Sequence, residues 1–554
     1  MKNLFLNKRK DILLILLLII LASVFFIINP SLKKTFEYNP DEGFELMKSS
    51  LYLNGFPLFS QIYSDQPPLY TVIVSFWFKL FGSSVYQGRL LILIFSLILI
   101  LTFYHIIKIW WGNFCAFMAA IFLLSSSLYI PLSASVMIGT ASLSLAMLSI
   151  YCITLYRKLY LKRYLILSAI FIALSLHTKL FTLFLLPLIP LEIIHAKRLN
   201  AKKTQQNHLL SQIFRDILLW FGIVSIIYLS IAIIFFHFNL PLYTQLLAKP
   251  HLKKLISPGD DFLRIWKTIR IDYDIALLAL IGVILLIKQK AGKFFLPLLW
   301  LILVFIIYVN YSPVWAHYYL LFSIPLCWLA AIYFRNFSIR NIAKKGISRW
   351  LIFILITVTI LRLPFKYNTN IRNIENEATT QEYKIINNLL LKYKPFTRWI
   401  VTNRPIFAFY ANLMVPPELV LTSHKRRFTD KTEQSYFIDR LEEYKPEQIL
   451  LVLDSLNFYG PEIISYIEEN YFKIYGNEFL HRTPVYSNFP ISYFWEPIGR
   501  YLPARMQIIA DKWFYDLVWH SLQIPVPRIK NIQGLAVNKT RVEIFIRKDI
   551  LERR

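Results

Sequence analysis

The sequence predicts a polytopic α-helical membrane protein with about 11 transmembrane helices, external amphipathic helices in the first loop and a C-terminal soluble α/β domain. Hydrophobic residues make up 56% of the 554 residues and charged residues only 17%, which is too apolar for a water-soluble domain. Apolar runs long enough to cross a hydrocarbon core of about 30 Å recur from residue 12 onward. From Lys366 the composition changes to that of a soluble domain.

The apolar runs divide the chain into candidate membrane spans. The predicted spans are residues 12–29, 89–108, 114–132, 135–156, 164–178, 180–195, 217–238, 273–288, 294–311, 318–334 and 349–365. The first span follows a basic segment, as in a signal peptide, but it lacks a small-residue cleavage site, so we expect it to remain as an anchor. The segment 67–84 begins with two prolines and is rich in aromatic residues, which favours a short helix at the membrane interface.

Loop charge predicts the orientation of these spans. Lys and Arg are frequent in the loops 157–163, 195–215, 288–293 and 335–349 and absent from the loops 133–137 and 311–317. Basic loops stay on the cytoplasmic side, so the N-terminus is expected there, and an odd number of spans places the C-terminal part outside. The sequence therefore predicts a multi-pass protein of the cell (inner) membrane with an external, periplasmic C-terminal domain. The loop 239–272 carries six basic residues on the outer side, where they suit anionic lipid or a phosphate substrate.

Net charge and cysteine content narrow the classes of function. The formal net charge of +28 comes largely from the loops between spans, so we expect no nucleic-acid partner. Cys115, Cys152 and Cys327 all fall within apolar runs and imply neither a disulfide framework nor a metal cluster. The sequence contains no Walker loop, Gly-rich dinucleotide turn, HExxH motif or nucleophile elbow, and hence no motif that cradles a nucleotide.

We expect three parts in the chain. Residues 1–365 form the membrane domain, whose first external loop spans 31–88, residues 366–485 form an external α/β domain, and residues 486–554 are a Trp-, Tyr- and Pro-rich extension with no assigned role. In the second part, RWIVTN and QILLVLDS predict buried strands, whereas TEQSYFIDRLEEYKP and GPEIISYIEENYFKIYG predict amphipathic helices.

The first external loop carries an acidic cluster. Asp41 and Glu42 follow Asn39–Pro40, which predicts a helix with both carboxylates in its first turn and Glu45 on the same face as Asp41. Asp65 lies later in the same loop. These carboxylates either cap helices and solvate the loop, or they serve in proton transfer or cation binding at the rim of the membrane domain.

Basic and aromatic residues are expected on the same outer face. Lys179 interrupts about thirty mostly apolar residues at an external turn, where an ammonium either snorkels to lipid head groups or meets an anion such as a lipid phosphate. Arg89, at the outer start of the second span, has the same two interpretations. His317 and Tyr318 stand where the tenth span begins, and for Tyr318 an ordinary place in the interfacial aromatic belt is the simpler interpretation.

Taken together, these motifs resemble the polytopic glycosyltransferases of the GT-C fold. The sequence is most similar to the bacterial relatives of the dolichyl-phosphate-mannose protein mannosyltransferases and of the aminoarabinose transferase that modifies lipid A. The resemblance rests on an Asp-Glu pair in NPDEGFELMKSSLYLNG, then SDQPPLYTVIVSFWFKLFG, SLHTKLFTLFLLPL, HYYLLFSIPL and VTNRPIFAFYANLMVPPELVLTS, and it covers residues 1–480. The chain departs from the pattern at Gln66, where relatives often have Lys or His, and at Ile138–Gly139–Thr140, where many have an acidic residue after the third span.

The resemblance implies transfer of a sugar from a polyprenyl-phosphate-linked donor to a hydroxyl of a lipid, glycan or protein acceptor at the external face. Asp41 would act as general base, and Lys179, with Arg89 as a weaker candidate, would stabilise the leaving phosphate. Glu42 and Asp65 would orient hydroxyls or hold a divalent metal, although a phosphate leaving group makes metal activation optional. His317 and Tyr318 would complete the phosphate site. Membrane lipids are further expected partners.

Two other classes of function remain open at this stage. A flippase or transporter of a lipid-linked saccharide would carry polar groups or broken helices near the bilayer midplane, whereas the ionisable residues here gather at one outer face. A structural subunit of an envelope polysaccharide assembly would tolerate Asp41→Asn without loss of pathway activity.

Overall fold

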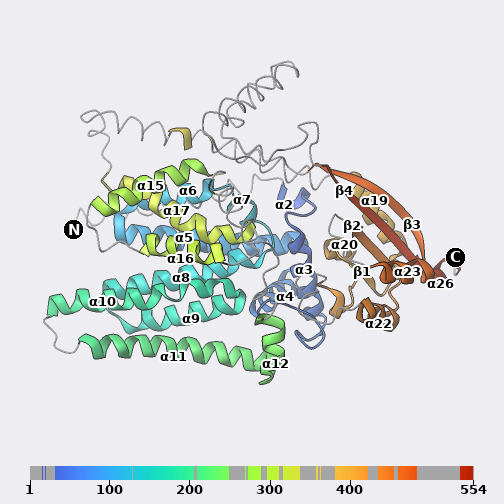
Figure 1. Ribbon diagram of the computed structural model, residues 1–554, viewed down its shortest axis with the longest axis horizontal. Helices are drawn as coiled ribbons and strands as arrows, with labels where there is room; N and C mark the ends of the chain where they lie inside the picture. Colours follow the sequence, from blue (N-terminus) through green and yellow to red (C-terminus); the bar gives the residue numbers. More distant parts are fainter. Residues whose placement is uncertain are drawn as a thin grey trace, which may run out of the picture.

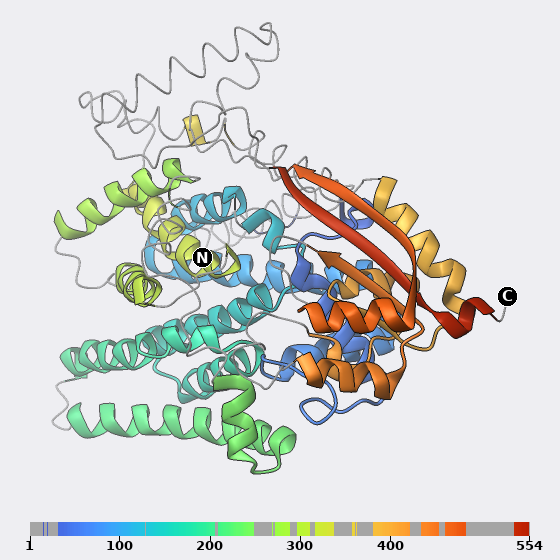
Figure 2. The same ribbon diagram turned by 45° about the vertical axis from the view of Figure 1, so that its right-hand side comes forward.

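The computed structural model describes most of the chain from Ser31 to Glu552. The described residues are 31–127, 129–204, 209–248, 272–288, 296–310, 316–336, 381–421, 434–453, 460–482 and 537–552, together with the single positions or short stretches 15, 19, 269, 357–359 and 362. A helical bundle and a mixed α/β domain lie at opposite ends, and the helices of the first loop lie between them in both views (Figures 1 and 2).

The bundle is built from apolar helices. They are α5 (Val85–Trp111), α6 (Asn113–Ser125), α8 (Ile138–Leu159), α9 (Lys162–Thr178), α10 (Leu188–Thr204), α11 (Leu209–Phe236), α15 (Tyr273–Lys288), α16 (Leu296–Asn310) and α17 (Leu320–Ala331). Within the described residues, four helical stretches are long and apolar enough to cross a membrane, namely Val85–Trp111, Ile138–Leu159, Leu180–Ala201 and Leu209–Phe236. The chain is therefore a multi-pass membrane protein. The predicted spans 12–29 and 349–365 fall almost wholly outside the described residues.

Two predicted spans differ in detail from the helices found. The span 114–132 is divided at Ser126–Ser127 into α6 and the short α7 (Tyr129–Leu132). The span 180–195 begins as a 3-10 turn, η1 (Leu180–Leu185), and only then continues as α10. Both irregular stretches lie next to polar residues described below, and irregular backbone at membrane depth is tolerated where protein groups satisfy it.

Small polar residues allow close packing inside the bundle. Ser149 of α8 and Ser168 of α9 have hydroxyl oxygens 2.9 Å apart, and about two turns further along the Ser142 and Ser175 hydroxyls are 3.2 Å apart. Small side chains let helix backbones approach, and in a membrane interior their hydroxyls need partners. The outer face of α11, by contrast, exposes large apolar side chains such as Phe214 (68%), as expected for a helix that faces lipid.

The first loop contains three helices, α2 (Ser31–Lys34), α3 (Pro40–Leu53) and α4 (Leu69–Phe81). The predicted start of α3 is confirmed, because the Asn39 side chain caps the helix by accepting a hydrogen bond from the Asp41 N–H at 3.0 Å and Pro40 occupies the first turn. Helix α4 begins after Pro67–Pro68 as expected and exposes Phe76 and Leu80 by 62% and 58%. Such an apolar face suits a helix at the membrane interface.

The α/β domain is a four-stranded sheet in the order β1-β2-β4-β3. Strands β1 (Ile400–Thr402) and β2 (Gln448–Leu453) are parallel, and β4 (Val537–Arg547) pairs antiparallel with both β2 and β3 (Tyr471–Arg482). The helices of the domain are α19 (Gln381–Tyr393), α20 (Pro405–Ala411), α22 (Gln434–Tyr444), α23 (Pro461–Asn470) and α26 (Lys548–Glu552). The predicted strands RWIVTN and QILLVLDS and the helix predicted in TEQSYFIDRLEEYKP are present. The helix predicted over GPEIISYIEENYFKIYG is found only as far as Asn470, because Tyr471–Gly476 form the start of β3.

The sheet extends beyond the domain end expected at residue 485. Strand β4 belongs to the C-terminal extension, yet it lies between β2 and β3 (Figure 2) and buries Val542, Ile544 and Ile546. Part of the extension therefore completes the α/β domain. Val542 and Ile544 also join one continuous apolar cluster with Leu46 of α3 and Tyr70 of α4, so the domain and the first loop share a core.

Candidate active site

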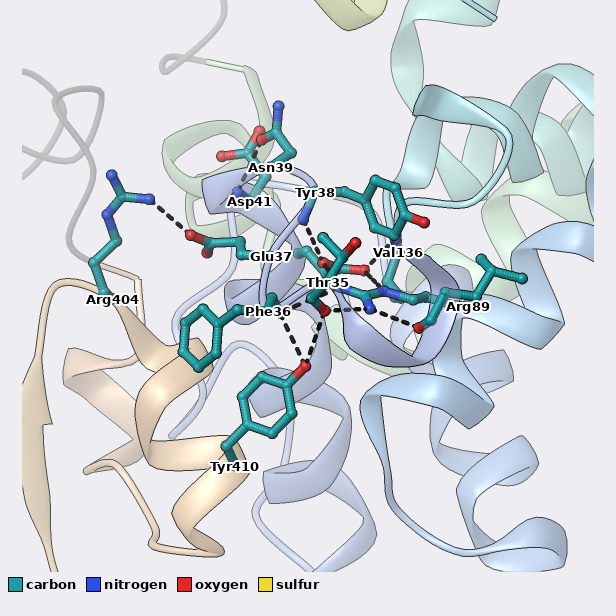
Figure 3. Close-up of polar contacts among 12 residues, drawn as sticks. Thr35, Phe36, Glu37, Tyr38, Asn39, Asp41, Arg89, Val136, Arg404 and Tyr410 are labelled. Carbon is teal, nitrogen blue, oxygen red and sulfur yellow. Dashed lines mark hydrogen bonds and ion pairs between the residues drawn. The ribbon is translucent and has the colours of Figure 1, made fainter. Parts of the chain in front are cut away.

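A buried ion pair joins the first loop to the bundle. Arg89 of α5 donates from Nε to Glu42 Oε1 at 2.9 Å and from Nη2 to Glu42 Oε2 at 2.8 Å (Figure 3). Both side chains are almost fully buried, at 1% and 0% exposed. A buried pair of this kind persists when the geometry is good and the remaining hydrogen-bonding groups are satisfied.

The rest of the Arg89 guanidinium binds the backbone that precedes α3. Its Nη1 donates to the carbonyls of Leu32 (2.8 Å) and Thr35 (2.7 Å), and its Nη2 donates to the carbonyl of Phe36 (3.2 Å). With the two bonds to Glu42, all five N–H groups of the guanidinium are used. The expected contact between Arg89 and a donor phosphate does not fit this arrangement, because no N–H remains to bind it.

Glu42 is saturated in the same way. Its Oε2 also accepts from the N–H of Tyr38 at 3.0 Å, and its Oε1 accepts from the N–H of Val136 at 3.1 Å. Two hydrogen bonds to each oxygen fill the acceptor sites of a carboxylate. The geometry thus gives Glu42 a structural role in joining α3, α5 and the segment before α8, in place of the expected contact with sugar or metal.

Asp41 differs from its neighbour in being exposed. It lies in the first turn of α3, one residue before Glu42, and Asn39 fixes its backbone N–H. The buried pair formed by Glu42 and Arg89 therefore fixes the start of α3 from the protein interior, while the side chain of Asp41 lies on the exposed surface of the helix. A carboxylate at a helix N-terminus is favoured in its charged form by the helix dipole.

A second layer of polar groups lies along the same face of α3. Glu45, 6% exposed, accepts at Oε1 from Lys48 Nζ at 2.7 Å, whereas its buried Oε2 has no hydrogen-bond partner among the described residues. Burial raises the pKa of Glu45, Lys48 lowers it, and the nearby Asp65 and Asp41 raise it further. Asp41, Glu45 and Asp65 therefore form one electrostatic cluster, which the sequence suggested by the spacing of Asp41 and Glu45.

Tyr70 borders this cluster from α4. Its side chain is fully buried, and its hydroxyl has no hydrogen-bond partner among the described residues. The pKa of Tyr70 is raised well above its ordinary value by burial first and then by Glu45 and Glu42. The phenol therefore stays neutral, and α4 presents an uncharged hydroxyl to the acidic face of α3.

Lys179 and Tyr318, predicted to share a phosphate site, lie together. Lys179 stands at the junction of α9 and η1 and is 6% exposed. Its Nζ lies 4.8 Å from the ring centre of Tyr318, in the 3-10 turn η3 (Ala316–Tyr319), and 5.2 Å from that of Phe181. Aromatic faces stabilise a cation in a place poor in water. The side chain of His317 lies outside the described residues.

The start of α8 contacts both the acidic residues of α3 and the turn that carries Lys179. The Val136 N–H binds Glu42, and the Ser142 hydroxyl lies 3.4 Å from the carbonyl of Lys179. Val136 lies two residues before α8 and Ser142 is the fifth residue of that helix, so both contacts come from one short stretch of chain. Leu180, next to Lys179, also packs against the apolar cluster that contains residues of α3 and α4.

A further carboxylate escaped the sequence analysis. Asp272, which precedes α15, accepts from the Ser126 hydroxyl at 2.9 Å and from the Ser127 N–H and hydroxyl at 3.0 and 2.8 Å. Asp272 therefore accepts hydrogen bonds from the backbone and side-chain donors at the break between α6 and α7. The signal available in the sequence was an Asp at the edge of an apolar span together with a Ser-Ser-Ser run at the end of another.

No metal centre is evident in the part of the chain that the structure describes, since no group of three or more His, Cys, Asp or Glu side chains is arranged to hold an ion there.

Comparisons with known proteins address the family. The profile of the family described as dolichyl-phosphate-mannose-protein mannosyltransferase matches residues 65–220. The structure is similar to ArnT from Cupriavidus metallidurans bound to undecaprenyl phosphate, with a TM-score of 0.59 and 12% identity over 83% of this chain and 96% of that one. The chain therefore has the GT-C fold.

This GT-C protein also resembles a second structure of known fold. The archaeal oligosaccharyltransferase AglB from Archaeoglobus fulgidus, in complex with an inhibitory peptide and a dolichol-phosphate, has a TM-score of 0.54 and 11% identity, over 98% of this chain and 89% of that one. None of the curated proteins matches the chain. At these identities the structural likeness concerns the fold, and the roles of individual residues in this chain rest on its own geometry.

Proposed function

We propose that the protein transfers a sugar from a polyprenyl-phosphate-linked donor to an acceptor hydroxyl at the external, periplasmic face of the membrane. One observation carries the proposal. The chain at the start of α8 binds Glu42, the neighbour of Asp41, through the Val136 N–H and binds the carbonyl of Lys179 through the Ser142 hydroxyl. An exposed carboxylate and a buried ammonium are thereby held at one end of the bundle. The structures of ArnT and AglB, bound to undecaprenyl phosphate and dolichol-phosphate respectively, support a lipid phosphate as the donor carrier.

The chemistry follows from these two groups. Asp41 takes the proton of the acceptor hydroxyl as its oxygen attacks the anomeric carbon of the donor sugar, and the bond between that carbon and the phosphate oxygen breaks. The lipid phosphate leaves with the additional negative charge, which Lys179 stabilises where little water screens it. Tyr318 holds the ammonium in place through its ring. Asp65 and Asp41 both raise the pKa of the buried Glu45, so the three carboxyls act on one another electrostatically.

Reconstitution into lipid vesicles tests this proposal. Purified protein is supplied with undecaprenyl-phosphate-linked hexose, N-acetylhexosamine or pentose and with lipid, glycan and peptide acceptors, and released undecaprenyl phosphate is measured. We expect transfer by the wild type, loss of at least about 100-fold in kcat for Asp41→Asn, and a similar loss for Lys179→Ala.

Matched control variants separate these effects from general damage. Asp439→Asn changes an exposed Asp of α22, and Lys392→Ala changes an exposed Lys of α19, 5.7 Å from the ring of Tyr393. Both should retain wild-type rates. Transfer that survives Asp41→Asn and Lys179→Ala would overturn the site, and translocation of the lipid-linked sugar without transfer would indicate a flippase.

A further inference from the structure

The segment between α2 and α3 is held from two sides. On the bundle side, Arg89 donates to the carbonyls of Thr35 and Phe36. On the other side, the Tyr410 hydroxyl of α20 donates to the same two carbonyls, at 2.9 Å to Phe36 and 3.4 Å to Thr35 (Figure 3). Two successive carbonyls are thus shared between a guanidinium of the membrane domain and a phenol of the α/β domain.

The ring of Phe36 enters the α/β domain. It stacks on Tyr383 of α19 with ring centres 4.6 Å apart, and it contacts Phe407 and Tyr410 of α20 at 4.7 and 4.8 Å. The neighbouring Glu37 accepts from Arg404 Nη1 at 3.0 Å. Aromatic contacts of this kind add specific geometry to the burial of apolar area. The segment is therefore fixed in direction as well as in position.

Helices α3 and α20 make a close backbone contact after Asp41 in the sequence. A Cβ added at Gly43 of α3 would lie 2.5 Å from the backbone nitrogen of Ile406 in α20. Only a residue without a side chain permits this approach. Contacts with the α/β domain therefore flank Asp41, with Phe36 and Glu37 before it and Gly43 after it.

Resting on the proposed function, we propose that the α/β domain sets the position of the catalytic carboxylate and that Tyr410 is a positioning residue for Asp41. Tyr410 acts through the carbonyls that it shares with Arg89 and touches neither substrate. The domain then participates in the reaction geometry itself, beyond any role in holding an acceptor. Loosening this contact should lower the rate of transfer with little effect on the binding of the donor, whose phosphate is assigned to Lys179.

Two substitutions loosen the contact in different ways. Tyr410→Phe removes only the hydroxyl, and we expect kcat to fall about 3- to 10-fold, as for loss of one hydrogen bond, with the KM for the lipid-linked sugar unchanged. Gly43→Ala forces α3 and α20 apart, and we expect a fall of about 10-fold or more. In both variants the pH dependence of kcat should shift, because the surroundings of Asp41 change, which a purely structural role would not produce.

Matched controls exist for both changes. Tyr436→Phe removes a hydroxyl of α22 that donates to Glu418 within the α/β domain and makes no contact with the carbonyls of Thr35 and Phe36. Gly222→Ala adds a methyl to a helix glycine in α11 with open space around it. Both should leave kcat unchanged. Wild-type kcat and pH profile in Tyr410→Phe and Gly43→Ala, or an equal loss in Tyr436→Phe, would overturn the inference.

A readout without activity separates this inference from the proposed function. Hydrogen exchange of residues 32–43, measured in detergent micelles, should be faster in Tyr410→Phe than in the wild type and unchanged in Tyr436→Phe. Unchanged exchange in Tyr410→Phe would refute the positioning contact even if the enzyme is active. If the wild type transfers no sugar but exchange increases in Tyr410→Phe, the proposed function fails and the contact between the domains stands.

Discussion

The Val136 N–H donates to Glu42 Oε1 at 3.1 Å, which joins the start of α8 to the helix that carries Asp41. Glu42 is thereby held by two different membrane helices, through Arg89 on α5 and through Val136 before α8. A shift of either helix end would move α3, and Asp41 with it. The position of the proposed base thus depends on this end of the bundle as well as on the α/β domain.

Arg89→Lys tests whether the guanidinium is structural. Lysine keeps the charge but has three donors in place of five, so at least two buried acceptors lose a partner. We expect the free energy of unfolding to fall by about 2–4 kcal/mol, measured by thermal unfolding in detergent. Arg215→Lys, at a side chain 63% exposed, is the matched control and should be neutral. Full stability of Arg89→Lys with weaker binding of undecaprenyl phosphate would restore the expected phosphate contact.

The pKa of Glu45 predicts a pH dependence of stability. Burial raises this pKa above its ordinary value of 4.5, so between the ordinary and raised values the folded protein binds more protons than the unfolded chain. Stability should therefore fall as pH rises through that window. Glu45→Gln removes the titrating group, and its unfolding midpoint should change less over the same pH range. Glu468→Gln, at an exposed position of α23, should follow the wild type, and identical slopes in all three proteins would contradict the prediction.

The ring of Tyr318 is expected to hold Lys179. Tyr318→Phe keeps the aromatic face, whereas Tyr318→Leu removes it, and a buried cation–π contact is worth roughly 2 kcal/mol. We expect the KM for the lipid-linked sugar to stay near wild type in Tyr318→Phe and to rise up to about 30-fold in Tyr318→Leu. Steady-state kinetics in vesicles measures both. Equal effects of the two substitutions would show that the hydroxyl matters, not the ring.

Asp272→Asn tests the connection between α15 and the break after α6. The amide replaces one acceptor oxygen with a donor, which then faces the hydroxyls and N–H of Ser126 and Ser127. Because these groups are largely buried, we expect a loss of about 1–3 kcal/mol in the free energy of unfolding. Asp272→Glu and the exposed Asp439→Asn provide comparison in the same thermal unfolding assay. No loss in Asp272→Asn would mean that the serines find other partners.

Local features of the site were accessible from the sequence, and pairings across the chain were less so. The start of α3 follows from Asn39 and Pro40 because capping acts within one helical turn. The charge of the loops placed Lys179 and Tyr318 on one face, and the structure brings them together. Arg89 and Glu42, 47 positions apart, were both singled out but were expected to bind substrate, since sequence spacing does not reveal that each satisfies the other.

The contact between Phe36 and the α/β domain had no local signal at all. Phe36 is an ordinary aromatic residue in a short connection, and its partners lie more than three hundred positions away in α19 and α20. Strand β4 was missed for a similar reason, because the long Trp- and Pro-rich stretch before it gives no indication that the chain returns to the sheet. Tertiary packing decides both features.

Strand β4 offers the last test, because it connects the end of the chain to the first loop. Ile544 is fully buried in β4 and belongs to the apolar cluster that also contains Leu46 of α3. Ile544→Asp places a charge in that cluster, so we expect the α/β domain to lose its fold and the rate of sugar transfer to fall by at least about 10-fold. Phe472→Asp, on β3 with the side chain 56% exposed, is the matched control in the same sheet.

Limited proteolysis and activity distinguish the possible results of the Ile544→Asp experiment. Cleavage confined to residues after about 380 together with a loss of transfer is the result we expect, because Asp41 would lose one of its two supports while the bundle stays intact. Cleavage of that region with full activity would show that the bundle alone holds Asp41, through Arg89 and Glu42. In that case the extension after residue 485 would stabilise its own domain without contributing to catalysis.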